Sequence, residues 1–264
     1  MSTRGPSDGA AAPVEHPPTS TAPRSAAAPA PRIERAQVPR LYAIADGDAL
    51  LGAAAGAAHR MSADPVGTVV EAVDAMAAAG VGWIQLRLKS LTDRERYRIG
   101  EAAARRLRGS GAPLWIDDRE DLAAVLGADG VHVGQADLSP ASVRSVVGDG
   151  VWIGLSCHGA EQVAAAERDP DVDVVAIGPV FTTRSKANPD PDVGLEGVRS
   201  ARLATSKPLV AIGGIDADSA AGVLEAGADS VVMLGAICRG DVAARSRALV
   251  AAAGRAFHRD DARP

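Results

Sequence analysis

The chain has 264 residues, 47% of them hydrophobic and 23% charged, with a formal net charge of -5 and a pI near 5.6. This length suffices for one large core or at most two domains. The acidic balance, without Lys or Arg runs interleaved with aromatic residues, argues against a nucleic-acid partner. No apolar run approaches the roughly 20 residues of a membrane helix, no signal-peptide pattern is present, and Cys157 and Cys238 lack metal-ligand spacing. We therefore expect a cytoplasmic protein without membrane contact, whose two thiols are buried and unreactive.

The first 38 residues are rich in Pro, Ala, Ser and Thr and carry almost no large apolar side chains. Such a segment cannot bury enough surface to offset its ordering entropy, so a disordered N-terminal arm is predicted over residues 1–38. We expect the catalytic domain over residues 39–255 and a flexible C-terminal tail over residues 256–264.

From Pro39 onward, short β-rich runs alternate with longer Ala-rich stretches of helical period, such as residues 64–79 and 94–108. Successive βα units of this spacing predict an α/β fold, a single (β/α)8 TIM barrel, more economically than an open doubly wound sheet. In such a barrel the chemistry collects at the C-terminal ends of the strands, so the residues that close each strand are the candidates for function. The predicted strands are 40–46, 81–89, 113–116, 129–133, 152–156, 173–177, 208–212 and 229–233.

The second predicted strand ends in QLRLK, which places Gln85, Arg87 and Lys89 on one face of the strand. Arg and Lys together match phosphate oxygens in geometry and charge, so an anion site is favoured. The alternative is an ordinary salt-bridge cluster at the rim of the barrel.

Acidic residues follow the third and fourth strands: IDDRED contains Asp117 and Asp118, and Asp137 comes after the fourth strand. Neighbouring parallel strands lie roughly 4.8 Å apart, so acids at their ends can converge on one cation. Because Mg²⁺ is typically held by one or two carboxylates plus waters and substrate phosphates, Asp118 and Asp137 are predicted to bind it. The alternative is that Asp117 or Asp118 caps the helix that starts near Glu120.

The fifth strand ends in GLSCHG, and the loop of residues 178–193 after the sixth strand is long and rich in Gly, Pro, Thr and Ser. This composition favours a substrate-covering loop, in which Lys186 is the expected anion ligand. Ser156 and His158 are ambiguous, since a single histidine is more often packed or hydrogen-bonded than catalytic.

Glycines close the last two strands, with Gly213 and Gly214 after the seventh, and Gly235 followed by Ala236 after the eighth. Glycines at these positions let backbone N–H groups approach a phosphate, a recurrent site in this fold. A plain tight turn is the alternative.

Taken in order, the motifs QLRLK, IDDREDLA, GADGVHVGQADL, GLSCH, IGPVFTTRSK, AIGGI and GADSVVMLGAI resemble the thiamine phosphate synthase family. The resemblance covers about residues 39–255. It implies a TIM-barrel transferase of thiamine biosynthesis that uses Mg²⁺ to join a hydroxymethylpyrimidine diphosphate to a thiazole phosphate and releases diphosphate. Its partners would be these phosphorylated small molecules, and the resemblance leaves homo-oligomerisation open.

The resemblance also implies roles for individual residues. Asp118 and Asp137 would be Mg²⁺ ligands, and Arg87, Ser156 and Lys186 the catalytic residues. The expected substrate contacts are Gln85, Arg87, Lys89, Asp117, Ser156, Thr183, Ser185, Lys186, Gly213, Gly214, Gly235 and Ala236. Departures from the family pattern are Asp117 where Asn is usual, Thr182 where Pro is usual, Ser185 where Thr is common and Gly235 where Ser is frequent.

Two other functions compete with this reading. One is a thiazole tautomerase-like isomerase of the same fold, which would use His158 and no metal. The other is a non-catalytic barrel that binds a thiamine precursor. The acidic pair and the basic face of the second strand favour the synthase over the tautomerase.

Overall fold

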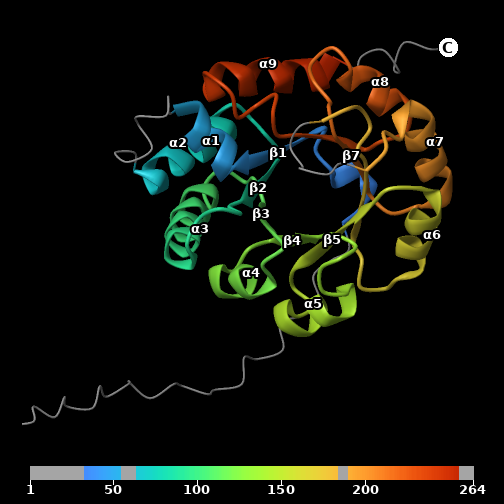
Figure 1. The fold of residues 1–264 in the computed structure, drawn as a ribbon, viewed down its shortest axis with the longest axis horizontal. Coiled ribbons are helices and arrows are strands. Elements are labelled where there is room, and N and C mark those ends of the chain that lie inside the picture. Colours follow the sequence, from blue (N-terminus) through green and yellow to red (C-terminus); the bar gives the residue numbers. More distant parts are fainter. Residues whose placement is uncertain (1–32, 55–63, 184–189, 256–264) are drawn as a thin grey trace, which may run out of the picture.

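The computed structural model describes residues 33–54, 64–183 and 190–255, whose strands close a parallel barrel in chain order (Figure 1). The TIM-barrel prediction is therefore confirmed. Strand boundaries agree with the predicted ones to within two residues, because runs buried on both faces have sharp polar or glycine ends. The strands are β1 (Leu41–Asp46), β2 (Trp83–Arg87), β3 (Leu114–Asp117), β4 (Gly130–Val133), β5 (Trp152–Cys157), β6 (Val174–Ile177), β7 (Leu209–Ile212) and β8 (Ser230–Met233).

The helices form a ring around the barrel, and α9 packs against α2 so that the ring closes (Figure 1). None of the helices in the described ranges has the length and apolar character that a membrane crossing requires. Their bounds are α1 (Gly47–Ala54), α2 (Pro65–Ala78), α3 (Asp93–Leu107), α4 (Glu120–Leu126), α5 (Pro140–Val147), α6 (Ala160–Arg168), α7 (Gly194–Ala204), α8 (Ala220–Glu225) and α9 (Val242–Arg255).

Large aromatic side chains fill the barrel interior, and glycines on neighbouring strands make room for them. A Cβ on Gly130 of β4 would lie 2.5 Å from the Trp115 ring, and a Cβ on Gly154 of β5 would lie 2.4 Å from His132 Nδ1. Trp115 is fully buried and its ring packs 5.0 Å from that of Trp83. The two glycines are thus required by packing inside the barrel, and no functional role is needed to explain them.

A short segment before β1 closes the N-terminal end of the barrel. Ile33 and Val38 flank the 3-10 helix η1 (Arg35–Gln37) and are only 7% exposed, within the aromatic cluster of the interior. Arg35 forms an ion pair with Asp229, at 2.8 Å. The prediction of disorder is therefore wrong for residues 33–38. It rested on the average composition of residues 1–38, in which the two buried apolar residues Ile33 and Val38 carry little weight. Residues 1–32 and 256–264 lie outside the described residues.

Candidate active site

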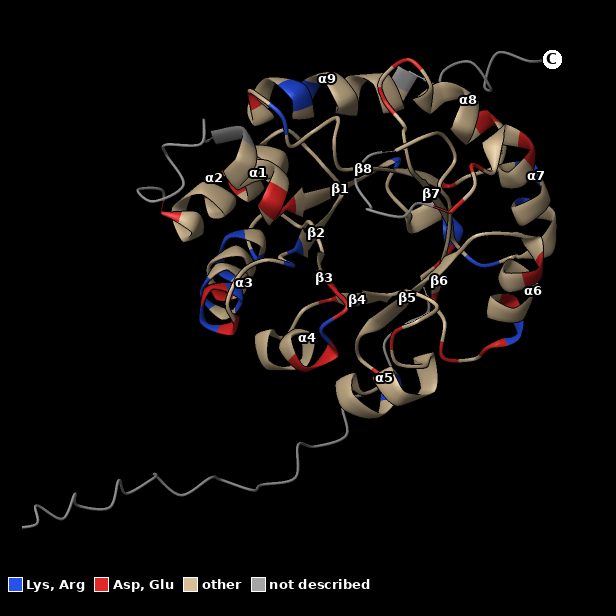
Figure 2. Cartoon of the chain, viewed as in Figure 1, with Lys and Arg blue, Asp and Glu red and all other residues tan. Residues whose placement is uncertain are grey.

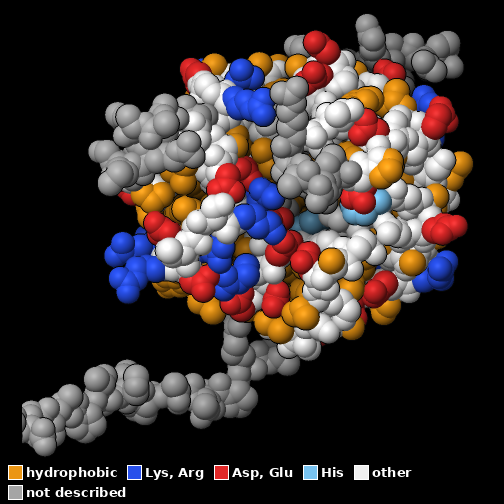
Figure 3. Space-filling model, viewed as in Figure 1, with side chains coloured by type: hydrophobic (Ala, Val, Ile, Leu, Met, Phe, Trp, Pro, Cys, Tyr) orange, Lys and Arg blue, Asp and Glu red, His pale blue; other side chains and the backbone are white. Residues whose placement is uncertain are grey.

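Basic residues at the end of β2 meet acidic residues at the ends of β1 and β3 (Figure 2). Arg87 pairs with Asp46, and its Nε lies 3.7 Å from Asp117 Oδ2. Lys89 Nζ lies 3.1 Å from the same oxygen and also pairs with Asp118. The predicted face of β2 is therefore brought to the mouth, where each of its two cations is already paired with carboxylates. In Figure 3 basic and acidic side chains lie next to one another near the centre of the visible face.

Gln85, the first residue of that face, lies deeper. Its side chain is 2% exposed, and its Nε2 donates to the Tyr42 hydroxyl at 2.7 Å. Burial raises the Tyr42 pKa well above its usual value, so this hydroxyl stays neutral and can accept the bond. Gln85 is thus fixed below the mouth by a neutral hydrogen bond.

Asp117 is the carboxylate with the least favourable surroundings. Burial raises its pKa, the positive charges of Lys89 and Arg87 oppose this rise, and the negative charge of Asp137 adds to it. Its buried Oδ2 receives no well-directed hydrogen bond within the described part of the chain. The 3.1 Å contact with Lys89 is therefore an ion pair without hydrogen-bond alignment. The Asp117 carboxylate thus faces the two cations Lys89 and Arg87 at the mouth without a well-directed hydrogen bond from either.

Asp118 has a strained backbone conformation. Its φ is +55°, the only positive value at a non-glycine residue in the described ranges. Its amide donates to the carbonyl of His132, at 2.9 Å, which ties the end of β3 to β4. The residue preceding α4 is Arg119, which makes no side-chain cap. The capping alternative for Asp117 and Asp118 is therefore wrong, and both carboxylates lie at the mouth, where they pair with Lys89.

The two predicted metal ligands can be tested on the chemistry of their donors. No group of three or more metal-type side chains occurs in residues 33–54, 64–183 and 190–255. Mg²⁺ needs only one or two carboxylates, with water and phosphate oxygens completing its shell. One oxygen of Asp137 accepts from the Gly134 amide at 2.7 Å, and the Lys89 ammonium already occupies a cation position between Asp117 and Asp118. In donor type, these carboxylate oxygens fit a hard divalent cation, and the Lys89 ammonium shows that a positive charge is accommodated between Asp117 and Asp118.

A second set of charges braces the loops that carry Lys89 and Asp118. Arg96 donates to the carbonyls of Leu88 and Lys89, at 2.8 and 2.6 Å. Asp93 accepts from Arg96 at 2.8 Å and from Arg119 at 2.7 Å. The β2–α3 and β3–α4 loops are thus connected through one carboxylate. Sequence reasoning missed this brace, since it joins the start of α3 to two separate loops.

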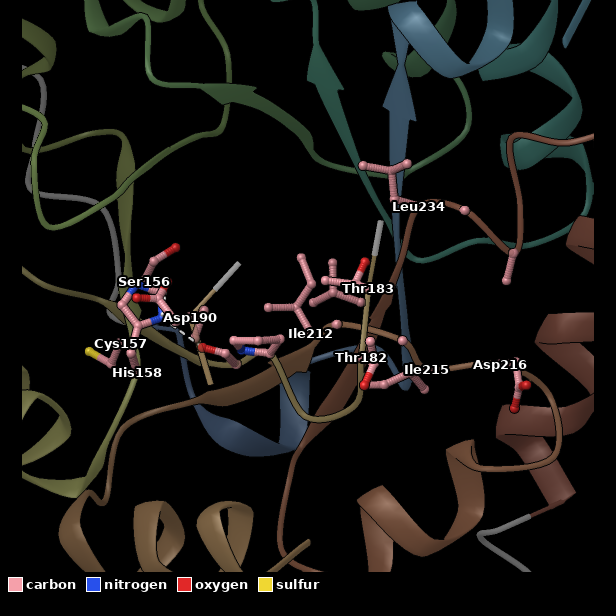
Figure 4. Close-up of a pocket in the computed structure, with 18 of the residues that line it drawn as sticks. Ser156, Cys157, His158, Thr182, Thr183, Asp190, Ile212, Ile215, Asp216 and Leu234 are labelled. Atoms are coloured by element: carbon pink, nitrogen blue, oxygen red, sulfur yellow. Dashed lines mark hydrogen bonds and ion pairs between the residues drawn. The ribbon is translucent and has the colours of Figure 1, made fainter. Parts of the chain in front are cut away.

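A cavity of about 570 Å³ lies at the ends of β5 to β8 (Figure 4). Ser156, His158 and Asp190 lie at one end, with Thr183 and Ile215 further along (Figure 4). Ser156 and Thr183 were predicted substrate contacts, and the structure brings both to this cavity. Two other predicted residues, Ser185 and Lys186, lie outside the described residues.

Ser156 is held by two residues that sequence reasoning missed. The His132 ring Nε2 lies 2.9 Å from Ser156 Oγ, and Gln135 Nε2 donates to the Ser156 carbonyl at 2.7 Å. His132 is the only polar side chain in the strand GVHV, and this was the available signal, because a polar residue inside a buried strand needs a partner.

His158 has a defined tautomer. Its Nδ1 lies 2.6 Å from the Gly178 carbonyl, which can only accept, so Nδ1 carries the proton. Asp190 Oδ2 lies 3.5 Å from the same nitrogen. Nε2 is then an acceptor on a residue that lines the cavity. Cys157 and Cys238 are buried and free, and burial raises the pKa of each thiol to about 12, so both are unreactive as expected.

Glycines close β7 for a steric reason. Gly213 and Gly214 have φ values of +105° and +64°, and a Cβ on either would lie within 2.7 Å of Pro179 or Phe181. Packing thus explains the glycines themselves. It does not explain the amides of Gly214, Ile215, Gly235 and Ala236. These four residues line the cavity, and their amides donate no hydrogen bond within the described residues. Unpaired N–H groups on residues that line a cavity are available to an anion.

A TIM barrel with charged and polar side chains gathered at the C-terminal ends of its strands has the architecture of a barrel enzyme. Comparison with known proteins identifies its family. The model of the family described as thiamine monophosphate synthase matches residues 59–237. The thiamine-phosphate synthase of Koribacter versatilis is 43% identical over 202 residues, which cover 75% of this chain and 88% of the relative. That of Acidothermus cellulolyticus is 45% identical over 166 residues, 62% of this chain and 78% of the relative.

A solved structure agrees with these sequence matches. The thiamine phosphate pyrophosphorylase of Pyrococcus furiosus aligns with a TM-score of 0.70 and 28% identity, over 84% of this chain and 98% of that protein. The chain belongs to the thiamine monophosphate synthase family and is an enzyme of thiamine biosynthesis of that type.

Proposed function

We propose that this enzyme joins a hydroxymethylpyrimidine diphosphate to a thiazole phosphate in the cytoplasm, with Mg²⁺ held by Asp118 and Asp137. The observation that carries the proposal is the division of the mouth into two anion sites of different chemistry. At β2 to β4, cations alternate with carboxylates. At β5 to β8, a cavity is lined by unpaired amides.

The β2 to β4 side suits a diphosphate that arrives with a divalent cation. Three carboxylates, those of Asp46, Asp117 and Asp118, face the two cations Arg87 and Lys89. This excess of acid disfavours a bare diphosphate at the same place. Mg²⁺ bound at Asp118 and Asp137 would offset the negative charge that develops on the leaving diphosphate.

The chain's own residues then orient the reaction. Arg87 and Lys89 bind the diphosphate oxygens, and Ser156, held by His132, donates its hydroxyl from the opposite wall. The bond between the pyrimidine methylene carbon and the diphosphate oxygen breaks, and the diphosphate keeps the electron pair. The lone pair of the thiazole nitrogen forms the new C–N bond, so no proton has to move.

The β5 to β8 side suits the thiazole phosphate. The amides of Gly214, Ile215, Gly235 and Ala236 can donate to phosphate oxygens. Apolar side chains that line the same cavity, including Ile212 and Leu234, give the thiazole ring a water-poor surface. Exclusion of water matters here, because water would otherwise capture the electrophilic methylene carbon.

The geometry of His158 supports a second candidate, the isomerase. With Nδ1 bonded to the Gly178 carbonyl, Nε2 is available as a base at the cavity. Such an enzyme would rearrange a thiazole by moving one proton and would need no second substrate.

One experiment distinguishes the functions. The purified chain is incubated with both substrates, with and without Mg²⁺, and thiamine phosphate and diphosphate are quantified. Equal amounts of both products, formed only with Mg²⁺, would support the synthase. Rearrangement of the thiazole in the absence of the pyrimidine would support the isomerase, and binding of both compounds without turnover would support a non-catalytic barrel.

A further inference from the structure

Two arginines line the β8 end of the cavity without a role in the site described above. Arg239 lies six residues after Met233, the last residue of β8, and Arg245 lies in the first turn of α9. Both side chains are exposed. Neither forms an ion pair with any carboxylate of the described residues. Their positions place two positive charges beside the unpaired amides of this end.

Arg239 lies over the backbone of Gly235. A Cβ added to Gly235 would be 3.9 Å from Arg239 Nη2 and 4.0 Å from its Cζ. The guanidinium group is therefore next to the amides of Gly235 and Ala236, which donate to nothing else in the described chain. A planar group with several N–H donors beside two further N–H donors matches the oxygens of a phosphate.

The carboxylates that line the same cavity are engaged elsewhere. Asp216 Oδ1 accepts from the amides of Asp218 and Ser219 and from the Ser219 hydroxyl, at 3.1, 3.0 and 2.8 Å. Asp190 Oδ2 lies 3.5 Å from His158 Nδ1. Arg245 instead donates to the Ala236 carbonyl, at 3.2 Å, and so holds the Gly235–Arg239 segment from α9.

Arg239 thus differs from the other cations of the mouth. Arg87 and Lys89 must exchange a carboxylate for a substrate oxygen, whereas Arg239 has no carboxylate partner among the described residues. Its contribution to anion binding therefore needs no metal to neutralise a competing acid.

We propose that Arg239 is a specificity-determining residue that binds the phosphate of the thiazole substrate, selects it over the unphosphorylated alcohol and does so without Mg²⁺. The identity of the ligand rests on the proposed function, whereas the anion site rests only on the position of Arg239 beside the amides of Gly235 and Ala236.

The test compares Arg239→Gln, Arg239→Lys and the matched control Arg247→Gln, which removes the same charge from an exposed position of α9 outside the cavity. Isothermal titration without Mg²⁺ measures the affinity of the full chain for inorganic phosphate, thiazole phosphate and thiazole alcohol. Loss of a hydrogen bond to a charged group should lower the affinity of Arg239→Gln for inorganic phosphate and for thiazole phosphate by about tenfold to a hundredfold. We expect a smaller loss in Arg239→Lys, and unchanged alcohol affinity in all three variants.

Steady-state kinetics give a second reading. Arg239→Gln should raise KM for thiazole phosphate and leave KM for the pyrimidine diphosphate and kcat unchanged. Wild-type phosphate affinity in Arg239→Gln, the same loss in Arg247→Gln, or no phosphate binding by the wild type would each overturn the inference. If the wild type binds inorganic phosphate through Arg239 but does not bind thiazole phosphate, the proposed function fails and the anion site stands.

Discussion

Asp229 at the N-terminal end of the barrel and Asp117 at the C-terminal end both lie beside two cations, and their side chains are only 9% and 13% exposed. Asp229 accepts from Arg35 Nε at 2.9 and 3.1 Å, from Arg202 Nη1 at 3.0 Å and from the Leu209 amide at 2.9 Å. Asp117 Oδ2 has neighbouring cations at 3.1 and 3.7 Å but no well-directed hydrogen bond among the described residues.

The difference indicates that Asp229 at the N-terminal end serves stability, whereas Asp117 at the C-terminal end serves function. A buried carboxylate whose oxygens are all hydrogen-bonded strengthens the fold, and its removal leaves its partners unpaired. A buried carboxylate without such donors is destabilising and is retained for something that the chain alone does not supply. Substitution of Asp by Asn should therefore lower stability at the N-terminal end of the barrel and change turnover or substrate binding at the C-terminal end.

The largest effect is expected at Asp118. Asp118→Asn should lower Mg²⁺-dependent turnover by roughly 10² to 10³, because the proposed Mg²⁺, which would offset the charge developing on the diphosphate, loses one of its two carboxylate ligands. The melting temperature should change little, since Asn tolerates a φ of +55° as well as Asp does. Turnover at saturating substrates and thermal unfolding of the same preparation measure both quantities.

Asp121→Asn is the matched control for this substitution, because Asp121 is an exposed acid in α4 that pairs with Arg119. It should leave turnover within about twofold of the wild type, since exposed pairs contribute little. Equal turnover in Asp118→Asn and Asp121→Asn would remove Asp118 from the metal site.

At the opposite end, Asp229→Asn should destabilise the fold and leave the chemistry intact. Breaking a buried pair of this kind lowers the free energy of unfolding by about 3 kcal/mol. A domain of this size should then melt roughly 6 to 12 °C lower. Urea unfolding and turnover at 25 °C are the measurements, and a loss of kcat in fully folded protein would contradict the division between the two ends.

The segment before β1 gives a smaller effect at the same end. Deletion of residues 1–38 removes the buried Ile33 and Val38 and the Arg35 ion pair, whereas deletion of residues 1–32 removes no described contact. Burial of two aliphatic side chains, reduced by the entropy of ordering the segment, leaves a net contribution of about 2 kcal/mol. The longer deletion should therefore melt several degrees lower than the shorter one. Identical melting curves would show that residues 33–38 do not stabilise the barrel.

The fold followed from the sequence because each strand is an apolar run with a polar or glycine end, and such runs have few alternatives in a parallel barrel. Docking of Ile33 and Val38 did not follow, since two apolar residues carry no periodicity by which to detect them.

The candidate site was only partly predictable for a related reason. Strand ends identified Arg87, Lys89 and Asp118, because position along a strand is readable from alternation. The pairing of His132 with Ser156 joins different strands, and Arg239 lies in a loop beyond β8. Such contacts depend on barrel closure and loop geometry, which alternation does not encode.

The smallest effect, and the one of opposite sign, is expected at Asp117. In Asp117→Asn the shape is kept and one negative charge is lost, so Lys89 and Arg87 no longer share their charge with Asp117 Oδ2. The pyrimidine diphosphate should then bind about three- to tenfold more tightly at low Mg²⁺, a change of roughly 1 kcal/mol that is typical of one partly screened charge. At saturating Mg²⁺ the affinity should differ little, because the metal offsets the same charge. Titration calorimetry at both Mg²⁺ levels measures this, with Asp121→Asn as control. A large loss of activity at every Mg²⁺ concentration would make Asp117 a direct metal ligand, and the unpaired Oδ2 would then be the oxygen that binds it.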